Sequence, residues 1–229
     1  MRLNKLWKEA ELASDARLAE ISYNAWHKVE RDLTLEESFY LCDSMLEAFD
    51  LPPLSLACVS AAKILAGRQW AICGGTAVTK LVKPRTTVDV DILVADRSTA
   101  LSLLLRSNEF FQAEGNKLKH RSGGEIDLLD TESGFWRTPQ QVARHALATA
   151  NRQRVCGADM PMVTPAGLIA TKLGRAMTDL IGADQDKVDI INVLFKYGYQ
   201  DLADFGISSA MQDEYDRLIA RAKAIQPEQ

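Results

Sequence analysis

Two aspartates interrupt a run of strand-forming residues, at a spacing that favours cation binding. Asp89 and Asp91 alternate with Val88, Val90 and Ile92 in the segment TTVDVDILVA. Because successive side chains of a strand point to opposite faces, the two carboxylates should share one face while the three apolar residues enter the core. Aspartate is unfavourable in strands, and two neighbouring negative charges repel each other. A divalent cation would offset both costs, since carboxylates are the usual ligands of Mg²⁺ held together with phosphates.

A third carboxylate follows in the segment GEIDLLD. Asp127 lies between Ile126 and Leu128 and repeats the apolar-Asp-apolar arrangement. If this strand pairs beside the first, Asp89, Asp91 and Asp127 converge. Three carboxylates suit two ions about 3.5–4 Å apart that clamp the attacking and leaving oxygens of a phosphoryl transfer. The alternatives are a solvated strand edge for the first pair and an edge-strand charge for Asp127.

Gly74 and Gly75 stand between the short apolar segment QWAIC and a short helix predicted in TAVTKLV, which Pro84 closes. A Gly-Gly turn before a helix lets backbone amides approach a phosphate, and the helix N-terminus favours negative charge. Many strand-to-helix turns use glycine, so the pair alone is a weak indication. Followed by the two aspartates, it predicts a site for a nucleoside triphosphate and metal.

These residues resemble the DNA polymerase β-like nucleotidyltransferase superfamily. The motif is an apolar residue and Gly-Gly at 73–75, then Asp-apolar-Asp-apolar at 89–92, with Asp127 in the place of the third carboxylate. The resemblance implies an α+β fold, a small mixed sheet flanked by helices. It also implies Mg²⁺ or Mn²⁺ on Asp89, Asp91 and Asp127, with Asp127 helping to activate an acceptor hydroxyl. The triphosphate of an NTP would lie against Gly74, Gly75 and the following amide of Thr76.

More narrowly, KPRTTVDVDILV is similar to the Arg-x-Thr-x-Asp-x-Asp stretch of the AbiEii-like nucleotidyltransferases, which include toxins of toxin–antitoxin pairs. Arg85 and Thr87 fall on this motif and would contact the nucleotide. The resemblance implies transfer of a nucleotide to an RNA, such as the 3′ end of tRNA, or to a protein hydroxyl. It also implies a cognate antitoxin or another protein partner.

A later Lys helix followed by an Asp-x-x-Asp helix extends the resemblance. Thr164 should cap the first helix, with Pro165 at its first position. The resemblance implies four further nucleotide-site residues, of which the lysine would contact the triphosphate and either aspartate would order the basic groups or the nucleotide. They are Lys172, Arg175, Asp186 and Asp189. The alternatives are an exposed amphipathic face for the two cations and first-turn acids that favour the helix dipole.

Composition limits the partners. A net charge of −4 and a pI near 5.5 argue against a chain that is basic all over, although a local basic stripe can still bind RNA. Its candidate members are Lys117, Lys119, His120, Arg121, Arg144, Arg152 and Arg154. A small alcohol such as an aminoglycoside is the alternative acceptor, and a non-catalytic binding module is the alternative to an enzyme.

The predicted elements divide the chain into three parts. Residues 1–66 form a helical N-terminal extension, 67–135 the nucleotidyltransferase core, and 136–229 a helical region that closes over the site. A helix is expected from Ser98, as its N-cap, through Phe110, and only helices are expected beyond Trp136. Cysteines and histidines are scattered, no apolar run reaches the roughly 18 residues of a membrane span, and a cytoplasmic protein is expected.

Overall fold

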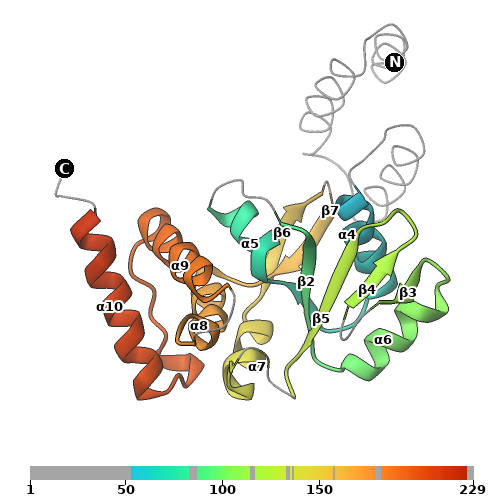
Figure 1. Ribbon diagram of the computed structural model, residues 1–229. Helices are drawn as coiled ribbons and strands as arrows, with labels where there is room; N and C mark the ends of the chain where they lie inside the picture. The colour runs from blue at the N-terminus through green and yellow to red at the C-terminus, as the bar shows by residue number, and fades with distance from the viewer. Residues whose placement is uncertain are drawn as a thin grey trace, which may run out of the picture. The chain divides into compact units, whose positions relative to one another are not determined.

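A seven-stranded mixed sheet organises the part of the chain that the structure describes. The computed structural model describes residues 53–82, 87–113, 117–132, 135, 137–156, 158–178 and 182–225. In these ranges the strand order is β3-β4-β5-β2-β1-β7-β6 (Figure 1). The strands are β1 (Trp70–Ile72), β2 (Asp89–Val94), β3 (Phe110–Gln112), β4 (Lys117–His120), β5 (Glu125–Asp130), β6 (Asn151–Val155) and β7 (Ala158–Met162). The described residues between 53 and 153 and between 160 and 225 belong to one compact unit, and the contacts described below lie within it.

Helices flank this sheet, as the predicted α+β class requires. They are α4 (Pro53–Ile64), α5 (Gly74–Leu81), α6 (Arg97–Arg106), α7 (Gln140–Ala148), α8 (Pro165–Ala176), α9 (Ala183–Tyr197) and α10 (Ser209–Ile225), with a 3₁₀ turn η1 (Ala203–Phe205). Helices α4 and α6 pack against each other and both contact β5. Helix α5 packs on β2 and also contacts α8 and α9, while α10 packs against α8 and α9 (Figure 1). The short helix after β1 is therefore held between the sheet and the C-terminal helices.

Strand β2 lies in the middle of the sheet and carries the first two aspartates. It pairs antiparallel with β1 and parallel with β5, in a register that sets Asp91 beside Asp127. Val90 and Ile92 are buried as predicted. The prediction is wrong for Val88, which is 75% exposed because it precedes the first paired residue of the strand.

Helix ends follow capping chemistry. Thr164 caps α8 as predicted, since its hydroxyl accepts a hydrogen bond of 3.1 Å from the Gly167 amide, and Pro165 opens the helix. The predicted cap at Ser98 is wrong. Asp96 caps α6 instead, because its carboxylate accepts from the Thr99 amide at 2.9 Å. Hydrogen bonds from Thr99 and Ser98 lower the pKa of Asp96 to about 2.

Three strands were absent from the prediction. Strand β3 begins at Phe110, the last residue of the expected helix, and three residues are too few to show an alternation. Strand β6 reads NRQRV, a polar sequence typical of a sheet edge, and β7 contains Pro161, which normally argues against a strand. The expectation of helices alone beyond Trp136 is therefore wrong.

The three-part division of the chain stays a prediction. Of the extension expected over residues 1–66, the part from Pro53 onward is described, and α4 is helical there as expected. No helix in the described ranges is both long and apolar enough to cross a membrane.

Candidate nucleotide and metal site

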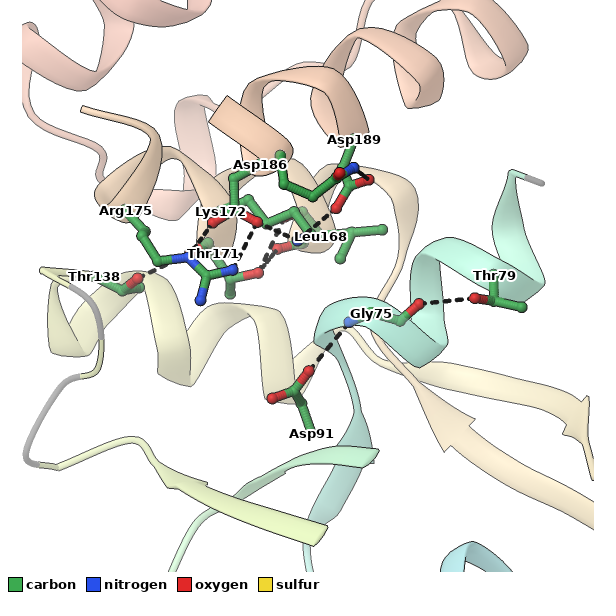
Figure 2. A network of polar contacts seen from close by, with 12 residues as sticks. Gly75, Thr79, Asp91, Thr138, Leu168, Thr171, Lys172, Arg175, Asp186 and Asp189 are labelled. Atoms are coloured by element: carbon green, nitrogen blue, oxygen red, sulfur yellow. Dashed lines mark hydrogen bonds and ion pairs between the residues drawn. The ribbon is translucent and has the colours of Figure 1, made fainter. Parts of the chain in front are cut away.

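Asp91 is the most buried carboxylate of the predicted metal set, with 7% of the residue exposed. Its Oδ2 atom accepts a hydrogen bond of 3.1 Å from the Gly75 amide at the start of α5 (Figure 2). Burial and the like charge of Asp89 raise the pKa of Asp91 to about 7, against the opposing effects of the Gly75 amide and the Lys172 charge. The folded chain therefore keeps at this point a carboxyl group that titrates near neutral pH.

Gly74 makes room for that carboxylate. Its φ of +58° lies in the left-handed region, and a Cβ atom at this position would come within 1.8 Å of Asp91 Oδ2. Helix α5 begins at Gly74 itself, whereas the sequence suggested a helix that starts after the glycines. Gly74 thus permits a close approach of helix and strand, a physical reason that the motif alone did not reveal.

Asp127 lies next to Asp91 on the neighbouring parallel strand. Because paired residues of adjacent strands point to the same face, both carboxylates share one side of the sheet. Burial, followed by the charge of Asp89, raises the pKa of Asp127. Its Oδ1 atom is buried and has no hydrogen-bond partner among the described residues. An acceptor left in this state is costly, and a bound cation or a donor on a substrate would satisfy it.

Lys117 enters the same group of carboxylates, a placement that the sequence argument missed. Its Nζ atom lies 2.7 Å from Asp89 Oδ2 and 3.8 Å from Glu125 Oε2. The hydrogen bond to Asp89 raises the pKa of Lys117, as do the surrounding negative charges. Lys117 was predicted in a basic stripe, but the register of β4 against β5 sets it beside Asp127. Only the pairing of the strands identifies this neighbour.

The chemistry of these groups fits a hard divalent cation. Carboxylate oxygens are the ligands that Mg²⁺ and Mn²⁺ prefer, and the Asp127 Oδ1 atom offers an unused acceptor. Within the described ranges, however, no three side chains of Asp, Glu, His or Cys lie close enough together to hold one ion. Asp91 and Asp127 are the pair best placed to hold it, because the ammonium group of Lys117 already contacts Asp89.

A second charged cluster joins α8 to α9. Lys172 Nζ lies 2.5 Å from Asp186 Oδ1 and 3.0 Å from Asp189 Oδ2, and all three side chains are at most 3% exposed. Arg175 forms a two-pronged contact with Asp186, in which its Nη2 atom donates at 2.9 Å (Figure 2). The alternative of an exposed helix face is therefore wrong for Lys172. Asp186 contacts both basic groups, and the role of this cluster in nucleotide binding stays a prediction.

This cluster influences the carboxylates of the sheet. Helices α5 and α8 pack together, and Figure 2 shows the cluster on elements that face Asp91 and Gly75. The charge of Lys172 lowers the pKa of Asp91. Burial lowers the pKa of Arg175, but Asp186, followed by Asp91 and Asp189, outweighs it and raises that pKa. The structure thus brings the two halves of the predicted site within electrostatic range of each other.

The predicted threonines contact the backbone of β2. The hydroxyls of Thr76 and Thr87 donate to the carbonyl oxygen of Asp89, at 3.5 and 3.0 Å. Both hydroxyls therefore help to position the aspartate strand, and their predicted contact with a nucleotide stays a prediction. Arg85 lies outside the described residues.

Comparison with known proteins supports the fold. No protein-family model matches the chain, and no curated protein sequence matches it. Among solved structures it is similar to an antigenic nucleotidyltransferase-like protein from Paracoccidioides brasiliensis, with a TM-score of 0.53 and 21% sequence identity. The similarity covers 76% of this chain and 89% of that chain. The chain therefore has a nucleotidyltransferase-like fold, which confirms the predicted fold class.

Proposed function

We propose that the protein is a metal-dependent nucleotidyltransferase, which moves an NMP group from an NTP to a hydroxyl acceptor and releases pyrophosphate. The observation that carries the proposal is the buried Asp91 carboxylate, enclosed by Gly74 and Gly75 and set in register with Asp127. A buried acid beside a second, half-buried acid is costly in a structural role. A divalent cation with a bound triphosphate accounts for that cost.

The carboxylates would divide the work. Asp91 and Asp127 would hold Mg²⁺ or Mn²⁺, which when bound supplies positive charge for the phosphates. Asp127 would also take the proton of the acceptor hydroxyl, because its buried Oδ1 atom has no hydrogen-bond partner among the described residues and can accept one. The acceptor oxygen then attacks the α-phosphorus, and the bond to the pyrophosphate group breaks. Asp89 would complete the group of three sheet carboxylates with Asp91 and Asp127, which we call the acidic face, and would hold Lys117.

The cations of α8 would have different roles. Lys172 is enclosed by two carboxylates and 3% exposed, which favours a role in ordering the cluster. The Arg175 side chain is 20% exposed, and its charge interacts with that of Asp91. Arg175 is therefore the better candidate to contact the triphosphate, together with amides of the α5 N-terminus.

The acceptor defines two candidate functions. On the AbiEii-like resemblance it is an RNA, such as the 3′ end of tRNA, or a protein, and the enzyme is the toxin of a toxin–antitoxin pair. Two members of the basic stripe are paired with acids, Lys117 with Asp89 and Arg144 with Glu132 at 2.7 Å. This pairing favours a small alcohol as the second candidate acceptor. Steep salt dependence of tRNA binding would favour the polyanion, because only a polyanion releases many counterions.

Calorimetric titration with each of the four nucleoside triphosphates, with and without Mg²⁺, tests the proposal. We expect Mg²⁺-dependent binding of at least one triphosphate by the native chain and its loss in Asp89→Asn/Asp91→Asn. Asp184→Asn is the matched control, because the Asp184 side chain is 99% exposed at the start of α9. Equal binding by the native chain and the double variant would contradict the proposal and favour a non-catalytic module.

A further inference from the structure

Lys117 forms an ion pair with Asp89 of the acidic face. Its ammonium group lies 2.7 Å from Asp89 Oδ2, a hydrogen-bonding distance, and 3.8 Å from Glu125 Oε2. The Asp89 side chain is 19% exposed, so part of its surface is already covered. The contact joins β4 to β2 across β5, and it is fixed by the register that sets Lys117 beside Asp127.

The neighbouring cluster supplies no surplus positive charge to this face. Lys172 and Arg175 carry two positive charges, and their partners Asp186 and Asp189 carry two negative charges. Neutralisation of the sheet carboxylates must therefore come from elsewhere, and Lys117 is in direct contact with one of them.

A divalent ion on the Oδ2 atom of Asp89 would have to replace this ammonium group. Two cations at the same Oδ2 atom would repel each other strongly. A small divalent ion would also have to lose bound water to reach this atom, a cost that Lys117 does not carry. Asp127 is in the opposite situation, because its buried Oδ1 atom has no hydrogen-bond partner among the described residues. Lys117 thus forms a hydrogen bond with Asp89 and leaves the buried Oδ1 atom of Asp127 unsatisfied.

We propose that Lys117 is a built-in cation, which takes the place of a second divalent ion at Asp89 and leaves a one-ion site at Asp91 and Asp127. This inference rests on the proposed function, since it assigns the number of ions in the same site. Lys117 is a positioning residue in this scheme, because it holds Asp89 and neutralises it without touching the reacting atoms.

The number of bound Mn²⁺ ions tests the inference without any measurement of activity. Electron paramagnetic resonance measures the free Mn²⁺ concentration, and the difference from the total gives the number of ions bound per chain. The native chain should bind one ion at this site, and Lys117→Met should bind two. Asp89→Asn in the Lys117→Met background should return the count to one. Lys117→Arg keeps the charge and should keep one ion, and Lys119→Met is the matched control on the same strand and face.

Circular dichroism and thermal unfolding of each variant verify that the fold is kept, and Lys117→Arg provides a test if Lys117→Met does not fold. Two ions in the native chain, or two in Lys117→Arg, would overturn the inference and leave the proposed function standing. One ion in a folded Lys117→Met would overturn it as well. No bound ion in the native chain and in Lys117→Met would remove the inference and the proposed metal-dependent function together.

Discussion

The backbone amide of Gly75 donates a hydrogen bond of 3.1 Å to Oδ2 of Asp91, so a strand carboxylate caps the helix that follows the glycines. The N-cap residue of α5, Cys73, provides no side-chain cap of its own. A negative charge at a helix N-terminus is favourable, which partly offsets the burial of Asp91. The glycine motif and the aspartate motif thus contact each other directly. Substitutions in either motif should affect both stability and ion binding.

Gly74→Ala should damage this contact. The new Cβ would lie 1.8 Å from Asp91 Oδ2, and the φ of +58° would become strained. We expect the free energy of unfolding to fall by about 2–5 kcal/mol, from left-handed strain and overpacking together. Urea unfolding measures the loss, and Mn²⁺ titration of the folded fraction should show weaker binding.

Gly67→Ala is the control for this substitution. Gly67 has a φ of +74°, but a Cβ atom there would meet nothing within 4 Å. It should cost only the strain of the left-handed conformation, about 1–2 kcal/mol, and leave Mn²⁺ affinity unchanged. Equal losses in the two variants would show that the Asp91 contact does not require a glycine.

Asp91→Asn should stabilise the protein at neutral and alkaline pH. The pKa of Asp91 is raised from 3.8 to about 7 in the folded state, so between these values the folded chain keeps a proton that the unfolded chain has lost. Its contribution to stability is present below pH 3.8 and is lost as the pH rises through about 7. Asparagine does not titrate. The advantage of the variant should therefore grow by about 1–4 kcal/mol between pH 4 and pH 8.

Urea unfolding at several pH values measures this advantage, with Asp184→Asn as an exposed control that should show little pH-dependent gain. A constant difference between Asp91→Asn and the native chain from pH 4 to pH 8 would disprove the raised pKa. The expected gain in stability would come with a loss of ion binding, because the amide is a weaker ligand than the carboxylate.

Lys172→Met should destabilise the fold strongly. It removes the ammonium group that Asp186 and Asp189 share and leaves buried carboxylates with less compensation. Breaking a buried ion pair from one side costs about 3–5 kcal/mol. Lys187→Met, on the same helix as the two acids, loses only a pair with the 99% exposed Asp184 and should change stability by less than about 0.5 kcal/mol. Similar urea midpoints for the two variants would contradict a structural role for Lys172.

Much of the fold was predictable because its signals are local. The alternation around Asp89 and its repetition around Asp127 identified β2 and β5, and Thr164-Pro165 identified the start of α8. The polar strand β6 and the proline-containing β7 have no such local pattern, because their pairing in the sheet determines their conformation. Pairing with neighbouring strands therefore determines the conformation of the strands that the local sequence did not predict.

The candidate site likewise contains residues that local sequence signals predict and residues that they do not. The spacing within one strand placed Asp89 and Asp91 together, and the repeated motif brought in Asp127. Lys117 was assigned to a basic surface instead, because a single sequence does not show which strands become neighbours. The burial of Lys172 was equally hidden, since its partners lie on the following helix and become neighbours only when α8 and α9 pack.

Arg175 and Lys172 should separate nucleotide binding from stability. Arg175 is the more exposed of the two, at 20% against 3%, and Asp186 keeps Lys172 as a partner when the guanidinium group is removed. Arg175→Met should therefore weaken Mg²⁺-dependent binding of the preferred triphosphate about 10-fold, with a smaller loss of stability than Lys172→Met. Arg217→Met is the control for triphosphate binding, because the Arg217 side chain on α10 is 72% exposed and pairs with Glu214 of the same helix. If calorimetry shows unchanged triphosphate affinity in a folded Arg175→Met, the phosphate contact must be assigned to another group, and the amides at the start of α5 become the remaining candidates.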